Sequence, residues 1–269
     1  MPRVNGIPLL GAGTYPLMGE DARRAVLMAV ELGIRHIDTA QMYGNEKEVG
    51  RALAESGLPR SSFHVVTKVD PGNVGASRFA ASVARSVEDL GGPADLLLIH
   101  WPPEEQEFDA ALDRLMAEKQ KGHARAIGVS NFSPAMMRRA QARCGGAIVN
   151  NQVEFHPLLD QSRLLAAARE LGIALSAYSP LARGAALKPA AIASVAARIG
   201  RSPSEVVLRW ILQQGVIAIP MTTKRENALS NLSALGFELT AEDMAAISAI
   251  GTKQGRTISP AWMNGRWEP

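Results

Sequence analysis

A short phrase of glycine, apolar residues and a polar residue recurs along the whole chain, and it constrains the fold more than any other feature. It is clearest in residues 33–38 and 172–179, where Gly33 and Gly172 each follow a helical segment and precede an apolar run. Glycine is favoured where a helix ends because it adopts positive φ without strain. Each copy therefore predicts a helix that ends and a buried strand that follows it. Looser copies lie in residues 61–68, 91–100, 121–130, 145–152 and 214–220.

These copies predict seven strands, and residues 6–14 (GIPLLGAGT) supply an eighth. Strands that alternate with helices over a whole chain form a parallel sheet covered by helices. Eight such units in 269 residues, with no break in composition, predict a single closed (β/α)8 TIM barrel domain over residues 1–269, with its active site at the C-terminal mouth. An open doubly wound sheet is the alternative. It normally carries GxGxxG after its first strand, and GAGTYP (11–16) lacks the third glycine.

Composition argues against several classes of function. Hydrophobic residues make up 46% of the chain, and the net charge of +3 comes without a dense block of Lys or Arg, so nucleic-acid binding is not expected. A single cysteine, Cys144, permits no disulfide within the chain and suits a reducing compartment. No run approaches the roughly 18 apolar residues that span a membrane. Charges in residues 20–24 interrupt the N-terminal segment early, which argues against a signal peptide. We expect a cytoplasmic protein that contacts no membrane.

Polar residues follow every predicted strand. In a parallel barrel the residues beyond the C-terminal ends of the strands meet at one mouth, where the active site lies. A single polar residue at such a place is often only a solvated loop side chain. A complete ring that includes an acid, a base and a histidine indicates a functional site. The ring consists of Thr14, Asp38, Lys68, His100, Ser130, Asn131, Gln152, Tyr178, Ser179 and residues 222–225.

Three of these residues, with a nearby tyrosine, suggest proton-transfer chemistry. Asp38, Lys68 and His100 leave neighbouring strands, and Tyr43 follows in the loop after Asp38. A free tyrosine titrates near pH 10 and is a weak acid at neutral pH, but a nearby ammonium group lowers its pKa. We predict that Lys68 lowers the pKa of Tyr43 toward neutrality and that Asp38 holds Lys68 in place. His100 would act as a neutral hydrogen-bond donor that orients a substrate oxygen.

The loop that carries Tyr43 has its own local prediction. Asn45 stands where a helix is expected to begin, and Glu48 follows three positions later. This spacing is typical of a side chain that caps the N-terminus of a helix. We therefore predict that Asn45 caps the helix and directs Tyr43 into the mouth.

Several motifs taken together resemble those of the aldo-keto reductases. They are HIDTAQMYGNE (36–46), TK (67–68), LLLIHWP (96–102), IGVSNF (127–132), NNQVEFHP (150–157) and SAYSPLARG (176–184). The resemblance covers nearly the whole chain in order. It implies a catalytic tetrad of Asp38, Tyr43, Lys68 and His100. It also implies NAD(P)H-dependent carbonyl reduction without a metal, in which hydride passes from the nicotinamide to the carbonyl carbon and Tyr43 protonates the oxygen.

The same resemblance implies a cofactor site. Ser130, Asn131 and Gln152 would hold the nicotinamide carboxamide, and the ring of Tyr178 would stack on the nicotinamide. Backbone N–H groups and a cation near the pyrophosphate would come from Ser179, Leu181 and Arg183. The complete expected set of cofactor-binding residues is Gly13, Thr14, Asp38, Ser130, Asn131, Gln152, Tyr178, Ser179, Leu181, Arg183, Thr222, Thr223, Lys224, Arg225 and Asn231.

The segment after the eighth strand departs from the family pattern. Many members carry a lysine and a serine behind the proline and an arginine further on, for the 2′-phosphate of NADPH. Here Met-Thr (221–222) follows Pro220, and Asn227 replaces the arginine. Lys224 and Arg225 nevertheless arrive at the start of the next helix, where phosphate binds well. The short bacterial branch typified by 2,5-diketo-D-gluconate reductase B has a similar Thr-Lys-Arg run. NADPH is therefore the expected cofactor, and NADH is the alternative.

The substrate site is expected to be apolar and rather open. Candidate substrate-binding residues are Tyr15, Met42, Tyr43, His100 and Trp101. Residues 1–10 leave room for only a short N-terminal hairpin or none, and the tail (251–269) is short. Trp262 would fold over the mouth or pack outside it. Expected substrates are 2-oxoaldehydes such as methylglyoxal, diketo sugar acids and aromatic aldehydes.

Other functions on the same barrel remain as alternatives. A metal-dependent hydrolase could use His36, Asp38 and His100, but the chain has no His-x-His pair and Lys68 brings a cation where a metal needs ligands. A barrel isomerase with a phosphate site after the last strands is another reading. A non-catalytic barrel that binds nucleotide and regulates a partner is a third, and turnover would distinguish it from an enzyme. We expect no bound metal and a monomer.

Overall fold

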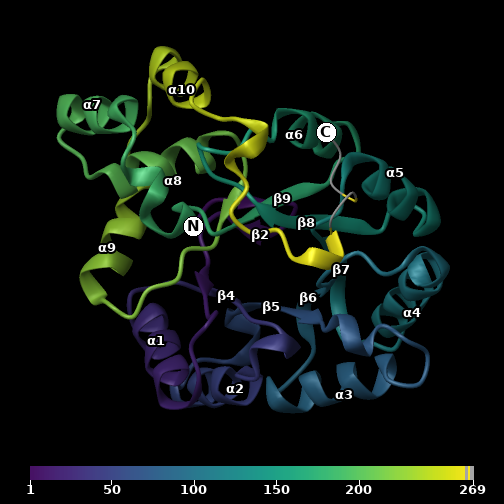
Figure 1. Ribbon diagram of the computed structural model, residues 1–269. Coiled ribbons are helices and arrows are strands. Elements are labelled where there is room, and N and C mark those ends of the chain that lie inside the picture. The colour runs from purple at the N-terminus through teal and green to yellow at the C-terminus, as the bar shows by residue number, and fades with distance from the viewer. Residues whose placement is uncertain (264–265, 267–269) are drawn as a thin grey trace.

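The computed structural model describes residues 1–263 and 266, and among these eight parallel strands form one curved sheet surrounded by helices (Figure 1). Leu10 pairs with Ala218, and Gly13 N–H donates to Pro220 O at 3.1 Å, so the first and last strands join and the sheet closes. The predicted barrel is confirmed. In sheet order the strands are β3 (Ala12–Gly13), β4 (His36–Asp38), β5 (His64–Val69), β6 (Ala94–Ile99), β7 (Ala124–Ser130), β8 (Ile148–Glu154), β9 (Ala174–Tyr178) and β10 (Ile217–Ala218).

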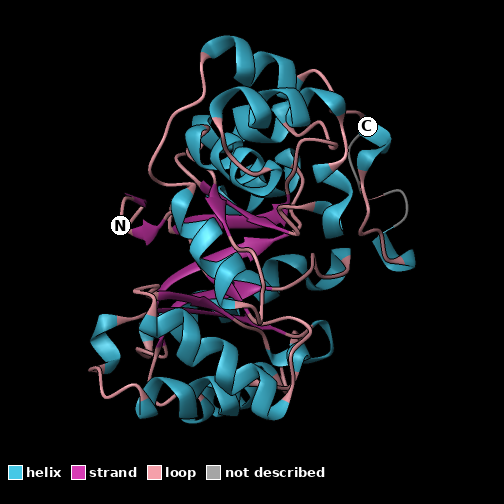
Figure 2. Cartoon of the chain, turned by 90° about the vertical axis from the view of Figure 1, so that its left-hand side faces the viewer, coloured by secondary structure: helices cyan, strands magenta, loops and turns pink. Residues whose placement is uncertain are grey.

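Helices cover the outside of the barrel, and the strands lie in the middle of the molecule (Figure 2). Two helices stand further out, since α10 packs on α7 and α7 on α8 (Figure 1). No helix among residues 1–263 is long and apolar enough to cross a membrane. The helices are α1 (Gly19–Glu31), α2 (Glu46–Glu55), α3 (Phe79–Asp89), α4 (Phe108–Gln120), α5 (Pro134–Arg143), α6 (Ser162–Glu170), α7 (Ala190–Ile199), α8 (Pro203–Gln213), α9 (Arg225–Ser233) and α10 (Ala241–Ser248).

The glycine phrase of the sequence has the expected conformation. Gly33 and Gly172 adopt φ of 87° and 68°, just after α1 and α6 end and just before β4 and β9 begin. A residue with a Cβ is strained at such angles, so glycine allows these short helix-to-strand connections. On the inner face of α1, Ala22, Val26 and Ala29 are buried against the sheet, as their spacing predicts.

A short hairpin closes the bottom of the barrel. Strand β1 (Arg3–Val4) pairs antiparallel with β2 (Ile7–Pro8), and Asn5 and Gly6 form the turn with φ of 48° and 79°. The side-chain amide of Asn5 donates to Gly172 O at 2.8 Å, just before β9. Ile7 is 1% exposed and packs with Val66 and other residues inside the barrel. The expected hairpin is therefore short but present.

The barrel interior also buries polar side chains below the mouth. His36 on β4 and His64 on β5 are register partners, and their rings meet edge to face with centroids 5.2 Å apart. His36 donates from Nδ1 to Pro8 O at 3.1 Å. The Nε2 atoms of both rings have no hydrogen-bond partner among residues 1–263. At this end of the barrel His36 is buried and His64 half-buried, and each ring has one nitrogen without a hydrogen-bond partner among these residues.

Candidate active site

Four polar side chains meet at the mouth of the barrel. Asp38 ends β4, Lys68 lies in β5, His100 directly follows β6, and Tyr43 ends a short 3₁₀ turn. The Nζ atom of Lys68 donates to Asp38 Oδ1 at 2.7 Å, to Thr39 O at 2.8 Å and to Tyr43 Oη at 3.3 Å. The rings of Tyr43 and His100 lie edge to face, with 5.6 Å between centroids. The structure thus brings all four predicted tetrad residues together.

The electrostatics of the pair Lys68–Tyr43 differ from the prediction. Burial raises the pKa of Tyr43 above its ordinary value, and the lowering effect of the Lys68 ammonium does not offset it. The prediction of a Tyr43 pKa shifted toward neutrality is therefore wrong. Burial by itself would lower the pKa of Lys68, but Asp38 and Tyr43 raise it overall. Lys68 is thus an ammonium and Tyr43 a neutral phenol at pH 7.

His100 is a neutral imidazole in this setting. Burial, and then the charge of Lys68, lower the pKa of His100 well below its ordinary value, as the sequence predicted. Its Nδ1 atom is buried and has no hydrogen-bond partner among the described residues. Buried polar atoms in proteins are nearly always paired. Other buried ring nitrogens also lack a partner among the described residues, on His36, His64 and His156, so what distinguishes His100 is its place at the mouth, where its ring meets that of Tyr43 edge to face.

The loop that carries Tyr43 is positioned by a different mechanism from the predicted one. Asn45 precedes α2 but its side chain makes no capping hydrogen bond, so the predicted cap with Glu48 is wrong. Instead, Asn45 Oδ1 accepts from Thr39 Oγ1 at 2.6 Å, and Asn45 Nδ2 donates to Leu17 O at 2.7 Å. The buried amide thus ties the loop after β4 to the loop after β3. Asn45 bonds to the two loops and does not cap the helix because its side chain is buried, so both the oxygen and the nitrogen of its amide need a partner.

Two predicted cofactor residues, on β8 and β7, connect to the tetrad through Asp38. Gln152 in β8 donates from Nε2 to Asp38 Oδ2 at 2.7 Å. Ser130 at the end of β7 donates from Oγ to the carbonyl of Gln152 at 2.8 Å. Thr14 also contacts Asp38, since its N–H and Oγ1 both donate to Asp38 O at 3.1 and 3.0 Å. Asp38 is therefore the point where the two sides of the mouth connect.

Asn131 and Tyr178 form a second connection across the rim. The hydroxyl of Tyr178 donates to Asn131 Oδ1 at 2.8 Å. Asn131 Nδ2 donates to His100 O and to Ser130 Oγ, each at 3.1 Å. Asn131 has φ of 65°, a left-handed conformation that asparagine tolerates better than most residues. The ring of Tyr178 is therefore held in one orientation at the end of β9.

The loop after β9 has an unusual backbone. Ser179, Ala182 and Arg183 have φ of 47°, 46° and 54°, and Gly184 has φ of 91°. Non-glycine residues at such angles cost of order 1–3 kcal/mol each, and they cluster at functional sites. Arg183 is exposed and Leu181 half-buried. The three residues predicted for the pyrophosphate thus lie in one strained loop beside Tyr178.

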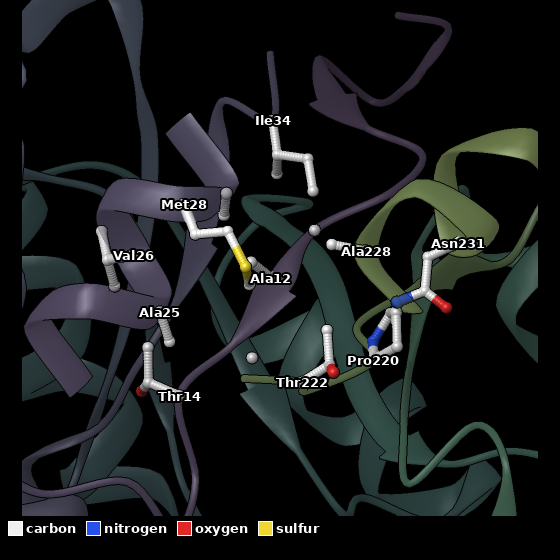
Figure 3. A pocket seen from close by; sticks show the side chains of 13 residues that line it. Ala12, Thr14, Ala25, Val26, Met28, Ile34, Pro220, Thr222, Ala228 and Asn231 are labelled. Atoms are coloured by element: carbon white, nitrogen blue, oxygen red, sulfur yellow. The ribbon is translucent and has the colours of Figure 1, made fainter. Parts of the chain in front are cut away.

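Further predicted cofactor residues surround a small cavity between β3, α1 and α9 (Figure 3). Its volume is about 20 Å³, and Gly13, Thr14, Thr222 and Asn231 all line it. Helix α1 contributes a further wall that was not predicted, in which Val26 and Ala29 are buried and Ala25 and Met28 half-buried. No motif distinguishes them.

The start of α9 exposes cations next to this cavity. Lys224 precedes the helix, and its N–H donates to Thr222 Oγ1 at 3.1 Å. The side chains of Thr223, Lys224 and Arg225 are exposed. Arg225 forms an ion pair with Glu31 at the end of α1, 3.1 Å apart. Arg225 thus has a structural partner, and Lys224 is the better candidate for a phosphate.

Aromatic and apolar side chains surround Tyr43 and His100 at the mouth. The rings of Tyr15 and Tyr43 lie 5.1 Å apart, and Trp101 stacks beside His100 at 6.3 Å. Tyr15 and Met42 are 56% and 45% exposed, so they lie at the rim rather than in the core. Met18 was missed by sequence reasoning; it is exposed and lies beside the Tyr43 loop.

The tail crosses the mouth and resolves the position of Trp262. Glu154 at the end of β8 accepts hydrogen bonds from the N–H groups of Thr257 and Ile258 at 2.7 and 3.1 Å. The tail then continues over the strands toward β7 (Figure 1). Trp262 meets Trp101 edge to face, with 6.1 Å between ring centroids. Trp262 therefore lies over the mouth. Residues 264–265 and 267–269 of the predicted domain and tail fall outside the described residues.

The donor set fits a nicotinamide nucleotide better than a metal. Both carboxylate oxygens of Asp38 are engaged, one by Lys68 and one by Gln152. Within residues 1–263 and 266, no cluster of three or more His, Cys, Asp or Glu side chains is close enough to hold a metal. By contrast, the rim carries side-chain amides, an aromatic ring, a loop with left-handed backbone and the start of a helix. These are the groups that bind a carboxamide, a pyridine ring and phosphates.

Comparison with known proteins identifies the family of this arrangement. Residues 4–252 match the model of the Aldo/keto reductase family. Methylglyoxal reductase DkgB of Escherichia coli O157:H7 is 39% identical over 266 residues, which are 97% of this chain and 99% of that protein. An aldo-keto reductase of Mycolicibacterium smegmatis is 39% identical over 258 residues, 95% of this chain and 93% of that one.

Solved structures agree with the sequence relatives. A crystal structure described as a candidate 2,5-diketo-D-gluconic acid reductase B superposes with a TM-score of 0.95 at 37% identity, covering 98% of this chain and 95% of the other. An aldo-keto reductase of Bombyx mori, solved in complex with NADP, superposes with a TM-score of 0.88 at 30% identity, covering 96% of this chain and 94% of the other. The family resemblance predicted from the motifs is confirmed.

Proposed function

This chain belongs to the aldo/keto reductase family of NAD(P)H-dependent oxidoreductases, and from that premise we propose that it reduces aldehydes or ketones to alcohols with NADPH and uses Tyr43 as the proton donor. The observation that carries this proposal is the contact of one buried ammonium, Lys68, with both Asp38 and Tyr43. A bound reduced nicotinamide supplies the hydride to the carbonyl carbon. Tyr43 transfers its proton to the carbonyl oxygen, and the O–H bond of the alcohol forms as the phenol O–H bond breaks.

Each residue of the tetrad has a distinct role in this reaction. Tyr43 stays protonated at neutral pH because burial raises its pKa, as a proton donor requires. Lys68 stabilises the phenolate that remains after the transfer, since its ammonium is already within 3.3 Å of Oη. Asp38 keeps Lys68 charged and in place. His100 is neutral, so it orients the carbonyl oxygen without a competing charge.

The choice of NADPH over NADH rests on the start of α9. Lys224 is exposed beside the cavity that Thr222 and Asn231 line. A cation and a positive helix end there favour the 2′-phosphate, which NADH lacks. The structural relatives include complexes with NADP and NADPH. Tyr178 supplies the flat surface for the nicotinamide, and Ser130, Asn131 and Gln152 contact its carboxamide.

The substrate class follows from the rim and from the relatives. Tyr15, Met42 and Trp101 form an apolar wall next to Tyr43 and His100. Relatives are named for methylglyoxal and for 2,5-diketo-D-gluconic acid. We therefore propose 2-oxoaldehydes such as methylglyoxal, diketo sugar acids and aromatic aldehydes as substrates. A cytoplasmic monomer is the assembly we propose, and size-exclusion chromatography with light scattering checks the monomer.

The first prediction concerns Tyr43→Phe. This variant keeps the ring but has no proton to transfer, so kcat for aldehyde reduction should fall by about 10²–10⁴-fold. The dissociation constant for NADPH should stay within about threefold of the wild type. Absorbance at 340 nm with methylglyoxal and with an aromatic aldehyde measures turnover, and quenching of tryptophan fluorescence measures NADPH binding.

Three results would each contradict a part of the proposed function. Full activity of Tyr43→Phe would remove Tyr43 from the mechanism. A wild type that binds NADPH but reduces no aldehyde would favour the non-catalytic nucleotide-binding barrel. Faster turnover with NADH than with NADPH would overturn the cofactor preference.

A further inference from the structure

The carboxylate of Asp38 is held from two sides of the barrel. Lys68, on the adjacent strand β5, donates to Oδ1 at 2.7 Å. Gln152, 114 residues later on β8, donates to Oδ2 at 2.7 Å. Asp38 is 3% exposed and Gln152 2% exposed, so water does not compete strongly with either bond. A residue of the proposed cofactor site is therefore bonded directly to the ion pair behind the proposed proton donor.

Chemistry fixes the orientation of the Gln152 amide. An ionised carboxylate only accepts hydrogen bonds, so the amide nitrogen of Gln152, and not its oxygen, must face Asp38. The main chain of Gln152 is fixed as well, because its carbonyl accepts from Ser130 Oγ at 2.8 Å and from Asn131 N–H at 2.9 Å. Gln152 is thus a rigid donor to Asp38, with its amide oxygen left to accept from another group.

The hydrogens of the Lys68 ammonium are all in use. An ammonium has three N–H groups. In this structure they face Asp38 Oδ1 at 2.7 Å, Thr39 O at 2.8 Å and Tyr43 Oη at 3.3 Å. The bond to Tyr43 is the longest and therefore the weakest of the three. If a further acceptor binds the Lys68 ammonium, the contact with Tyr43 is therefore the first to be lost.

We propose that Gln152 is a positioning residue for proton transfer: by holding Asp38 Oδ2, it prevents the carboxylate from turning both oxygens toward Lys68 and so preserves the contact between Lys68 and Tyr43. This inference rests on the proposed function, in which Gln152 also contacts the nicotinamide carboxamide. It adds that the same side chain connects the cofactor site to the proton donor.

Loss of the Gln152 donor has a defined consequence. Asp38 Oδ2 would become a buried acceptor without a partner, which is unfavourable unless the carboxylate turns to find one. Lys68 already donates to the other oxygen of this carboxylate, and a carboxylate that uses both oxygens on it draws Nζ away from Tyr43. The lowering effect of Lys68 on the pKa of Tyr43 then weakens, and that pKa rises further.

The test uses Gln152→Met, which matches the length of glutamine but has no N–H donor, and Gln152→Glu. Lys224→Ala is the control, because it removes a different proposed cofactor contact, at the start of α9. For each protein, tryptophan fluorescence gives the Kd for NADPH, and aldehyde reduction gives kcat as a function of pH. If Gln152 only holds the cofactor, Gln152→Met should change the Kd for NADPH but not the pH dependence of kcat, as is expected for Lys224→Ala.

We expect kcat of Gln152→Met to fall by about tenfold at saturating NADPH and substrate. Reduction needs protonated Tyr43, so kcat decreases at high pH as Tyr43 ionises. In Gln152→Met this decrease should move upward by about half a pH unit or more. In Gln152→Glu, the new carboxyl can donate to Asp38 only when protonated. Its kcat relative to wild type should therefore recover as the pH falls.

A readout without turnover separates this inference from the proposed function. The chain has three tyrosines, so absorbance near 295 nm can follow their ionisation, and Tyr43→Phe identifies the step that belongs to Tyr43. That step should lie at higher pH in Gln152→Met than in the wild type and in Lys224→Ala. An unshifted step, or a Gln152→Met enzyme in which only the Kd changes, overturns the inference. A wild type that reduces no aldehyde overturns the proposed function instead, and the titration still decides the role of Gln152.

Discussion

At the scale of single residues, Tyr178 combines a flat ring with a buried hydroxyl. Burial raises the pKa of Tyr178, so the phenol stays neutral and donates to Asn131 Oδ1. Aromatic stacking contributes about 0.5–1.5 kcal/mol, and a neutral hydrogen bond contributes a similar amount. The hydroxyl therefore matters because it fixes the plane of the ring on which the nicotinamide is proposed to stack.

Two variants of Tyr178 should weaken NADPH binding to different degrees. Tyr178→Phe keeps the ring but loses its anchor, so the Kd for NADPH should rise by about fivefold. Tyr178→Ala loses both, and the Kd should rise by about 30-fold. Fluorescence titration with NADPH measures both values. Equal effects of the two variants would mean that stacking contributes nothing.

The two cations at the start of α9 should differ in how strongly they affect the KM for NADPH. Arg225 is already paired with Glu31, whereas Lys224 lies outside the helix beside Thr222. Lys224→Ala should raise the KM for NADPH by about tenfold and leave the KM for NADH unchanged, because a charge-assisted phosphate contact is lost. Arg225→Ala should have a smaller effect on the KM for NADPH. Steady-state kinetics with both nucleotides check this order, and a larger effect of Arg225→Ala would reverse the assignment.

At the scale of elements, one of the contacts that fix the tail to the barrel is a close approach of two backbone segments. Thr252 N–H donates to Leu158 O at 3.0 Å, and Leu159 pairs with Thr252. A Cβ added at Gly255 would lie 1.7 Å from Leu158 O, so only glycine fits there. The segment from this contact to Trp262 then lies over the mouth. The position of Trp262 beside the proposed substrate site thus depends in part on a backbone contact outside that site.

Gly255→Ala should therefore displace the tail. We expect a loss of about 2–3 kcal/mol in the free energy of unfolding and a change in the tryptophan fluorescence of the folded protein as Trp262 leaves Trp101. Gly75→Ala is the matched control, because a Cβ at Gly75 meets nothing within 4 Å. Guanidinium unfolding monitored by fluorescence measures both effects. Equal stability of the two variants would show that the tail does not depend on this contact.

At the scale of the whole molecule, two histidines inside the barrel make the stability of the fold sensitive to acid. Burial lowers the pKa of His36, and burial together with His36 and nearby arginines lowers that of His64 to about 3. An unfolded histidine titrates near 6.5. Below that pH the unfolded chain binds protons that the folded barrel excludes, so stability is complete above about pH 6.5 and decreases as the pH falls toward 3.

The free energy of unfolding should therefore be lower at pH 4.5 than at pH 7.5. His64 should account for about 2–3 kcal/mol of this decrease. His64→Asn removes the titrating group, so its unfolding free energy should depend less on pH over this range. Guanidinium unfolding at both pH values gives the comparison. The same slope in wild type and variant would exclude His64 as a cause.

The sequence by itself determined the barrel, the mouth and the family. Helix ends at Gly33 and Gly172, the buried strands and the polar residues beyond them are local features, and parallel strands bring their ends together without further information. The motifs then identified the candidate tetrad. These inferences need only the order of residues along the chain, because periodicity and backbone preference act over a few positions.

Only the tertiary structure decided how these residues are held. It replaced the predicted Asn45 cap with contacts to two loops, reversed the predicted direction of the Tyr43 pKa, and placed Trp262 on Trp101. It also joined Gln152 to Asp38 across 114 residues. The physical reason is common to all four. Desolvation and hydrogen bonding depend on distances between side chains that are far apart in the chain, and packing of the closed barrel sets those distances.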